Sequence, residues 1–119
     1  MTIGEIAKKI HLSESTLRYY EKKGLLQVKR DEHGRRIYEE MDIEWIKFIR
    51  RLKETGMPLK EIKHYSELRY LGDSTMIERL KILRKHRDYV LHQKNLWDEY
   101  LQNLDEKISF YNLSIKNYD

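Results

Sequence analysis

Three side chains on the stretch TLRYYEK can make the contacts that a nucleic acid offers. Arg18 carries a planar guanidinium whose N–H groups match the O6 and N7 atoms of guanine. The hydroxyls of Thr16 and Tyr19 can donate to phosphate oxygens, which positions a protein on a duplex without reading its sequence. The chemistry of this stretch therefore predicts a surface that binds a polyanion.

The period of the same stretch sorts its side chains onto two faces of a helix. When Leu17 points into a core, steps of about 100° per residue turn Arg18 and Tyr19 outward and leave Tyr20 at the margin. Tyr20 is therefore open between a core position and a phosphate contact. The candidate DNA contacts on this helix are Thr16, Arg18, Tyr19, Tyr20 and Lys22.

A second basic segment follows at residues 27–38, QVKRDEHGRRIY. The turn-like sequence DEHG between two short runs predicts a β-hairpin. Alternation of sides puts Arg36 and Tyr38 on one face, where they can lie along the sugar–phosphate backbone. Lys60, near the start of a later helix, is a further candidate for a phosphate contact, helped by the helix N-terminus.

Local signals predict the helices that position these residues. Thr2 with Glu5 spells a capping box for a first helix that runs to about Lys9. Ser13 can cap a second helix, and Gly24 can end it in a left-handed conformation. Two short helices with so brief a connection predict a helix-turn-helix.

Two more helices and a junction follow. Asp42 is a good cap for a third helix that ends at Gly56, and Pro58 opens a short fourth helix. The sequence LGDS that comes next is the expected hinge. We therefore expect a DNA-binding domain over residues 1–70 and a dimerisation helix over residues 71–119.

From Met76 onward the chain has neither glycine nor proline and fits an uninterrupted heptad repeat. Eleven of its thirteen a and d positions are apolar, and the exceptions are Arg87 and Lys94. This repeat predicts a coiled coil, because the chain has too little protein beside it to bury the stripe. A second copy is the expected partner, with packing across the chain's own N-terminal domain as the alternative. The expected dimerisation residues are Leu80, Leu83, Val90, Trp97, Leu101, Leu104, Ile108 and Tyr111.

The chain of 119 residues has a net charge of +4, and its basic excess is confined to the N-terminal part. Residues 8–36 hold nine Lys or Arg against four Asp or Glu, whereas residues 73–119 hold eight of each. A localised basic patch favours a polyanionic partner such as double-stranded DNA. Mean hydropathy is -0.84, so we expect a modest core in a fold dominated by helices.

Cysteine is absent, which excludes disulfides, thiolate metal sites and cysteine nucleophiles. No Ser/His/Asp constellation, phosphate-binding loop or metal-ligand cluster stands out, so we expect neither an enzyme nor a cofactor. His86 and His92 lie about 240° apart around a helix and cannot chelate one metal ion together. No apolar run approaches a membrane span and no signal peptide is evident, so we expect a cytoplasmic, nucleoid-associated protein.

The stretches TIGEIAKKIHLSESTLRYYEKKGLL, GRRIY and DIEWIKFIRRLKETGMPLKEIK, followed by a long helix, resemble the MerR-type transcriptional regulators. The resemblance is densest over residues 2–63 and extends in architecture to the end of the chain. It implies a winged helix-turn-helix with a small β-hairpin wing. It also implies a long C-terminal helix that dimerises as an antiparallel coiled coil.

The same resemblance implies a mode of action. A homodimer would bind a pseudo-palindromic promoter operator, bend and untwist it, and act there on RNA polymerase. Such deformation of DNA has an elastic cost that contacts at both ends of the dimer must offset. By motif match, the DNA contacts are Thr16, Arg18, Tyr19, Tyr20, Arg36, Tyr38 and Lys60.

The sequence leaves the effector open. The segment WIKFIRRLKETGM resembles a subgroup of short regulators that respond to aldehydes or other electrophiles. In that subgroup a cysteine often stands where Arg51 stands here, which argues against an electrophile-sensing thiol. Arg87 and Lys94 either line a pocket for an anionic effector or fix the register of the coiled coil against acidic residues of a second copy. Those acidic candidates are Asp98, Asp105 and Glu106.

Two other classes stand as alternatives to a dimeric regulator. A DNA-architectural or excisionase-like protein without effector control would share the winged helix, but it needs no long heptad helix. A coiled-coil interaction protein would carry the basic N-terminal part incidentally. The heptad helix joined directly to a helix-turn-helix favours the regulator.

Overall fold

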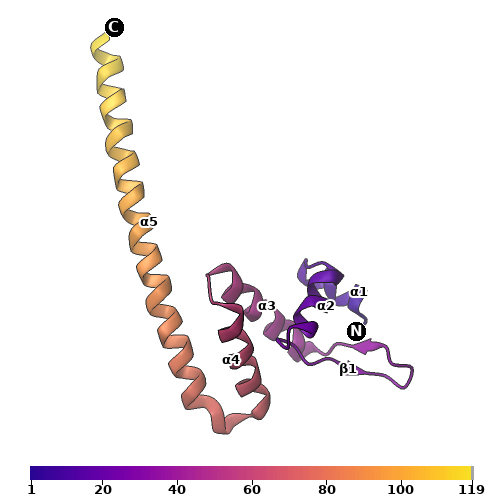
Figure 1. Cartoon of the computed structure of the whole chain (residues 1–119). Helices are drawn as coiled ribbons and strands as arrows, with labels where there is room; N and C mark the ends of the chain where they lie inside the picture. The colour runs from indigo at the N-terminus through magenta and orange to yellow at the C-terminus, as the bar shows by residue number, and fades with distance from the viewer. Residues whose placement is uncertain (119) are drawn as a thin grey trace. The chain divides into compact units, whose positions relative to one another are not determined.

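The computed structural model describes residues 1–118 and divides into two compact units, residues 1–82 and residues 83 onward. The first unit contains α1 to α4, η1, the start of α5 and a two-stranded hairpin (Figure 1). The second unit is a continuation of the last helix. The elements are α1 (Ile3–Ile10), α2 (Glu14–Lys22), β1 (Lys29–Arg30), β2 (Arg36–Ile37), α3 (Glu40–Glu54), α4 (Leu59–Leu71), η1 (Asp73–Thr75) and α5 (Met76–Tyr118).

The helix-turn-helix is confirmed, and its two caps are the predicted ones. The Thr2 hydroxyl accepts the Glu5 amide at 3.1 Å, and the Ser13 hydroxyl accepts the Thr16 amide at 3.1 Å. His11 ends α1 in the left-handed conformation with φ 56°. Because this one residue reverses the chain, α2 begins within three residues of the end of α1.

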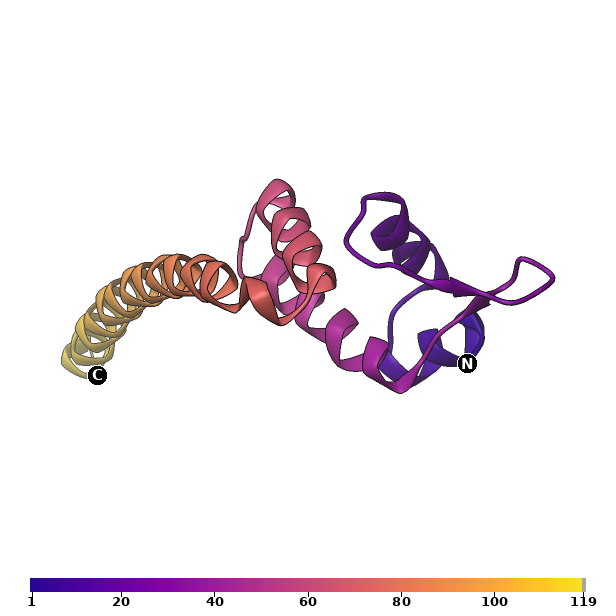
Figure 2. The ribbon, with the colours of Figure 1, turned by 90° about the horizontal axis from the view of Figure 1, so that it is seen from below.

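The predicted hairpin is present and antiparallel, with Lys29 paired to Ile37 and Arg30 paired to Arg36. Its tip is closed by Asp31, whose Oδ1 atom accepts the backbone amides of His33 at 2.8 Å and Arg35 at 2.9 Å. Figure 2 shows this loop projecting away from the helices of the first unit. The strands are two residues each, so hydrogen bonds at the tip stabilise the hairpin as much as its ladder does.

The third helix starts earlier than the sequence analysis predicted, at Glu40 rather than after Asp42. The Asp42 carboxylate is the reason, because it reaches back to accept the Glu39 amide at 2.8 Å and completes a capping box with Glu39 as the N-cap. Asp42 is therefore in the first turn of α3. Pro58 precedes α4 as its N-cap residue, one position before the first helical turn.

The core of the first unit is formed where α1, α2, α3 and α4 meet. Its side chains are aliphatic with a few aromatic rings, and many have no exposed surface. Trp45, Phe48 and Tyr65 stack between α3 and α4, with ring centroids 5.8 to 6.2 Å apart. The aliphatic core comprises Ile6, Ile10, Leu17, Leu25, Leu26, Ile43, Ile46, Ile49, Leu52, Ile62 and Leu68.

The long helix α5 is confirmed over 43 residues, and none of its described side chains is buried within this chain. The junction before it is held by Thr75, whose hydroxyl donates to the carbonyl of Leu68 at 2.6 Å. Gly72 turns the chain there with φ 101°, a conformation that glycine adopts without strain. The division into functional domains after residue 70 stays a prediction, because the compact units meet inside α5.

Candidate nucleic-acid interface

The exposed face of α2 carries the side chains that the helical period turned outward. Leu17 has no exposed surface and Tyr20 has 3%, so these two residues anchor the helix to the core. Arg18 and Lys22 are exposed, and Tyr19 keeps 36% of its surface exposed. The helix therefore presents a cationic and hydroxyl-bearing strip to solvent.

Thr16 lies at the start of this strip and is half-buried. Its hydroxyl is 2.7 Å from the Ser13 hydroxyl, which already caps the helix. The Ser13 hydroxyl also accepts the Thr16 amide, and the two hydroxyls form a small polar group at the start of the helix. Such a group can share a hydrogen bond with a phosphate without breaking the cap.

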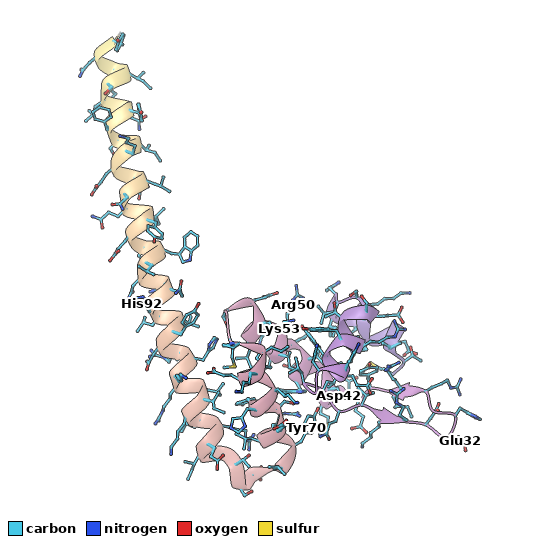
Figure 3. The ribbon with its side chains drawn as sticks, in the orientation of Figure 1. Glu32, Asp42, Arg50, Lys53, Tyr70 and His92 are labelled. Carbon is cyan, nitrogen blue, oxygen red and sulfur yellow. The ribbon has the colours of Figure 1, made fainter. Side chains whose placement is uncertain are left out.

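The two adjacent tyrosines occupy different environments although their ring centroids are only 6.4 Å apart. Burial raises the pKa of the Tyr20 phenol, which therefore remains protonated. Lys53 of α3 places its ammonium 4.8 Å from the Tyr19 centroid and 5.4 Å from the Tyr20 centroid. Lys53 lies on the part of α3 beside α2 (Figure 3), so a cation from a distant segment reinforces the positive face of α2.

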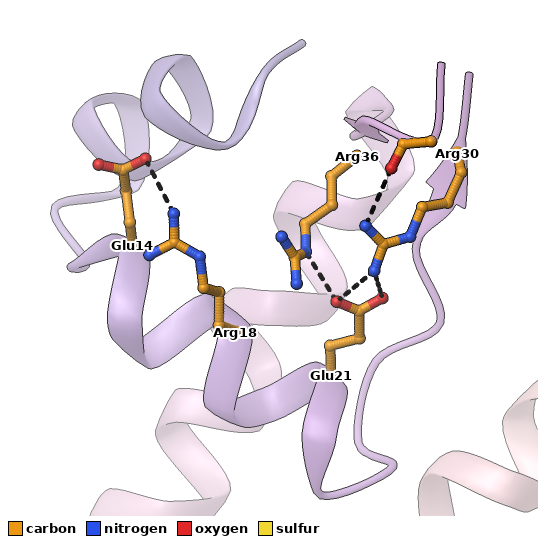
Figure 4. A network of polar contacts seen from close by, with 6 residues as sticks. Glu14, Arg18, Glu21, Arg30 and Arg36 are labelled. Carbon is orange, nitrogen blue, oxygen red and sulfur yellow. Dashed lines mark hydrogen bonds and ion pairs between the residues drawn. The ribbon is translucent and has the colours of Figure 1, made fainter. Parts of the chain in front are cut away.

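A network of charges joins α2 to the hairpin (Figure 4). The Glu21 carboxylate accepts from Arg36 Nε at 2.7 Å and from Arg30 Nη2 at 3.1 Å, and Arg30 Nη1 also donates to the Gly34 carbonyl at 3.2 Å. Glu21 thus holds one arginine from each strand. Since both strands are bound to the same carboxylate, the hairpin is held beside α2.

Tyr38, just after β2, is 1% exposed, and among the described residues its hydroxyl has no hydrogen-bond partner. Burial raises the pKa of this phenol too. A buried hydroxyl without a partner loses about 1–3 kcal/mol relative to a satisfied one. Tyr38 therefore carries an unused donor at the junction between α2 and the hairpin.

One backbone oxygen ties the end of α2 to both of the following helices. The Leu25 carbonyl accepts the Trp45 indole N–H at 3.0 Å and the Ser66 hydroxyl at 2.7 Å. The Tyr70 hydroxyl, labelled in Figure 3, accepts the Gln27 amide at 3.0 Å. These bonds connect the loop that follows α2 to α3 and α4.

Residues 1–68, more than half of the chain, match the family described as MerR HTH family regulatory protein. The chain belongs to the MerR family. Residues 43–106 also match the family described as MerR, DNA binding, which spans α3, α4 and much of α5. The resemblance inferred from the sequence motifs is thereby confirmed, and the chain is a MerR-type transcriptional regulator.

Individual relatives match over nearly the whole chain. An uncharacterised HTH-type transcriptional regulator of Haemophilus influenzae is 40% identical and covers 92% of this chain and 82% of its own length. HiNmlR, whose crystal structure is described as a MerR family regulator lacking the sensor domain, bound to promoter DNA, is 40% identical over 93% of this chain and 89% of that chain, with a TM-score of 0.83. A MerR family regulator of Listeria monocytogenes is 32% identical over 94% of this chain and 86% of that chain, with a TM-score of 0.90.

The structure places the predicted contacts of this MerR regulator in two groups. Arg18, Tyr19 and Lys22 share the exposed strip of α2, and Lys60 is exposed on the first turn of α4. Tyr20 and Tyr38 are buried, and Arg36 is half-buried against Glu21. Contact with DNA by this second group requires the hydroxyl tips or the guanidinium to be reached from the surface, and it stays a prediction.

Two functional neighbours were missed from the sequence, Glu21 and Lys53. Glu21 is an acid in a basic run, and nothing local shows that it reaches β1 and β2, which follow it by 9 and 15 residues. Lys53 is more than thirty residues from the tyrosines that it covers. Its helical period on α3 could have placed it next to Arg50 and Glu54, but not over α2.

Arg51, the residue discussed above in connection with electrophile sensing, lines an open hollow of about 270 Å³. The hollow is lined by α1, the α1–α2 connection and one face of α3. Within the described part of the chain, no group of three His, Asp or Glu side chains could hold a metal ion. Across residues 1–118, no helix has the length and apolar character needed to cross a membrane.

Proposed function

We propose that this chain is a homodimeric regulator that reads a pseudo-palindromic promoter operator, with one α2 helix in each half-site. The observation that carries the proposal is the division of α2 into a buried side and an exposed strip. Leu17 and Tyr20 fix the helix to the core, and Arg18, Tyr19 and Lys22 face solvent. A helix held in this way can enter a major groove without unfolding.

In this proposal the side chains have distinct roles. Arg18 reads a base edge, because its guanidinium is exposed and its neighbour Glu14 lies 3.8 Å away on the same helix, a weak pair that DNA can displace. Tyr19, Lys22 and Thr16 contact phosphates. Arg36 extends the surface to the hairpin, which serves as a wing along the backbone.

Tyr38 and Lys60 complete the proposed backbone contacts. The Tyr38 hydroxyl has no partner among the described residues and lies at the root of the wing, so a phosphate oxygen that approaches there would satisfy it. Lys60 lies in the first turn of α4, which no side chain caps and where the helix N-terminus also favours an anion. Tyr20 contributes mainly by packing, with only its hydroxyl available for a phosphate.

Dimerisation through α5 is the second half of the proposal. The helix spans about 64 Å at about 1.5 Å per residue and has no buried side chain in this chain. Its dimerisation residues are exposed or half-buried, Trp97 at 69% and Leu104 at 60% among them. A second copy would cover this stripe and place two recognition helices on one operator.

Family membership and the promoter-DNA complex of HiNmlR support a proposal for the mode of action. We propose that the dimer bends and untwists the operator, acts there on RNA polymerase and works on the nucleoid. The relatives are transcriptional regulators, and we propose no catalytic activity. Binding to DNA on this pattern needs no cofactor.

The experiment that tests the proposal combines genome-wide mapping of binding sites with affinity measurements on the mapped operator. Arg18→Ala should lose about 1–3 kcal/mol of specific binding and relax the base preference at one position in each half-site. Lys22→Ala is the matched control on the same strip, and it should weaken binding equally on all sequences. An Arg18→Ala effect that is equal on operator and unrelated DNA would refute the base-reading role.

A further inference from the structure

The long helix places two cations where its coiled-coil seam should be apolar. Arg87 and Lys94 occupy successive a positions of the heptad, and both side chains are exposed. Among residues 1–118, neither they nor the nearby Asp98 and Asp105 form an ion pair within the chain. A charge at an a position is destabilising unless a partner helix supplies an opposite charge. The following inference rests on the proposed dimerisation through α5.

A parallel arrangement of two copies would leave these cations unpaired. In a parallel pair each a position faces the same a position of the partner, so Arg87 would face the partner's Arg87 and Lys94 the partner's Lys94. Two consecutive layers of like charge would repel each other at the seam. The charges of this helix therefore select the antiparallel arrangement.

In an antiparallel pair each a position lies level with a d position of the partner, beside the e position that follows it. One register matches every a and d residue from Met76 to Ile115 with a partner. In that register the layers, with the second residue belonging to the partner subunit, are Met76 with Ile115, Leu80 with Tyr111, Leu83 with Ile108, Arg87 with Leu104, Val90 with Leu101, and Lys94 with Trp97.

The same register brings opposite charges together. Beside Arg87 lies the partner's Asp105, and beside Lys94 lies the partner's Asp98. These two aspartates are the acidic residues among the e positions of the helix, and they meet its two basic a positions. The remaining e positions, which fall beside apolar a positions or at the ends, are Ile77, Arg84, Leu91 and Asn112.

Shifting the helices by one heptad in either direction breaks one of the two pairs. In one direction Arg87 meets the partner's Asp98, but Lys94 meets the partner's Leu91. In the other direction Lys94 meets the partner's Asp105, but Arg87 meets the partner's Asn112. Only the register that aligns the apolar layers over residues 76–115 pairs both cations.

We propose that Arg87 with Asp105, and Lys94 with Asp98, fix the register of an antiparallel α5 dimer, so that they set the spacing between its two recognition helices. The two-fold axis then passes between residues 95 and 96. The Arg87 pair is the diagnostic one, because its members are 18 residues apart and cannot meet within one helix. Lys94 and Asp98, by contrast, are one helical turn apart and could also pair within a subunit.

A charge swap in the full chain tests the pairing. Arg87→Glu and Asp105→Arg each place like charges together at two symmetry-related sites, and each should raise the dimer dissociation constant roughly ten-fold or more. The double variant should return it to within about three-fold of the original. Glu106→Arg is the matched control, because this adjacent acid occupies the outward f position and should leave dimerisation unchanged. A double variant no tighter than the singles would overturn the pairing.

Disulfide mapping tests the register directly, because the natural chain has no cysteine. Leu80→Cys with Tyr111→Cys should give a covalent dimer on oxidation. Leu80→Cys with Leu104→Cys, and Leu80→Cys with Tyr118→Cys, report the two registers displaced by a heptad and should remain uncrosslinked. A crosslink through either displaced pair would overturn the register while keeping the dimer. A monomer in sedimentation would instead overturn dimerisation itself, and with it the proposed function.

Discussion

Apolar side chains in regular stripes are buried in the first unit but exposed on the long helix α5. Leu17 in α2 has no exposed surface, whereas Leu104 in α5 is 60% exposed. Both leucines belong to regular apolar stripes, so composition does not separate them. The difference is that the stripe of α2 is covered within the first unit, where Leu17 and Tyr20 are buried, whereas α5 has no buried residue. The first unit buries its apolar stripes within one chain, and α5 leaves its stripe exposed for the second copy proposed above.

Charges repeat this contrast. In the first unit, Glu21 receives Arg30 and Arg36 at 3.1 and 2.7 Å, which leaves its carboxylate satisfied inside the chain. In α5, Arg87 and Lys94 have no such partner among the described residues. Pairing within the chain holds the hairpin beside α2, while the charges without a partner on α5 are the ones that we propose a second copy pairs.

The largest effect on stability should come from truncating a buried leucine of the first unit, and the same truncation in α5 provides the comparison. Leu17→Ala should lower the free energy of unfolding by about 3–5 kcal/mol, because it opens a cavity in a closed core. Leu104→Ala should leave the first unit stable and weaken the dimer. Urea unfolding of both variants at two protein concentrations separates the cases.

The dependence of each loss on protein concentration separates a contact within one chain from a contact between two copies. The loss in Leu17→Ala should be the same at both concentrations, because its packing lies within one chain. The loss in Leu104→Ala should grow on dilution, since a dimer contact is governed by mass action. Equal, concentration-independent losses would mean that α5 packs within its own chain.

A smaller effect, on DNA affinity, should follow from neutralising the Glu21 carboxylate, which binds one arginine from each strand of the hairpin. Glu21→Gln keeps the shape of the side chain and raises the net charge, so simple electrostatics predicts tighter DNA binding. We expect the reverse, a loss of about 1 kcal/mol on the operator, because two charge-assisted hydrogen bonds to the wing are weakened. Glu14→Gln, whose partner Arg18 is 3.8 Å away, is the control and should not weaken binding. Tighter operator binding by Glu21→Gln would show that this residue only reduces positive charge.

The smallest effect should be a loosening of the hairpin tip at acidic pH, with no change in the rest of the chain. The Arg35 backbone amide, helped by that of His33 and by the Arg35 guanidinium, holds the pKa of the Asp31 carboxyl below its ordinary value. A lowered pKa means that the tip is stabilised above the ordinary value of about 3.9 and loosens as pH falls through the lower one. NMR titration of the His33 and Arg35 amides should show this transition, and Asp31→Asn should abolish it. A simultaneous change in α5 amides would contradict its local origin.

The sequence predicted those parts of the fold that depend on neighbours along the chain. The caps at Thr2 and Ser13, the left-handed Gly24 and the heptad of α5 each need only a few adjacent residues, and all are present. The start of α3 was placed too late, because Asp42 is as good a partner in the third helical position as it is a cap. An aspartate at the N-cap and an aspartate in the third helical position both accept a backbone amide at the start of a helix, so the local sequence fits either placement.

Contacts between segments that are far apart in the chain could not be predicted from the sequence. Arg18 and Tyr19 were placed outward by period alone, and they are exposed as predicted. Strand alternation put Tyr38 on the same face as Arg36, but that face is turned toward α2, where Arg36 binds Glu21, so Tyr38 is buried while Ile37 on the other face is exposed. Lys53 and Glu21 act across gaps that no periodic pattern spans.

The carbonyl of Leu25 connects the end of α2 to both α3 and α4. The Trp45 indole and the Ser66 hydroxyl both bind this single oxygen, and all three groups are buried or sit in the core. If the end of α2 slid away from α3 or α4, one of these donors would be stranded at a cost of about 1–3 kcal/mol. The shared acceptor therefore couples the position of the end of α2 to the positions of α3 and α4, so that a displacement of α4 would also shift the proposed DNA-binding face.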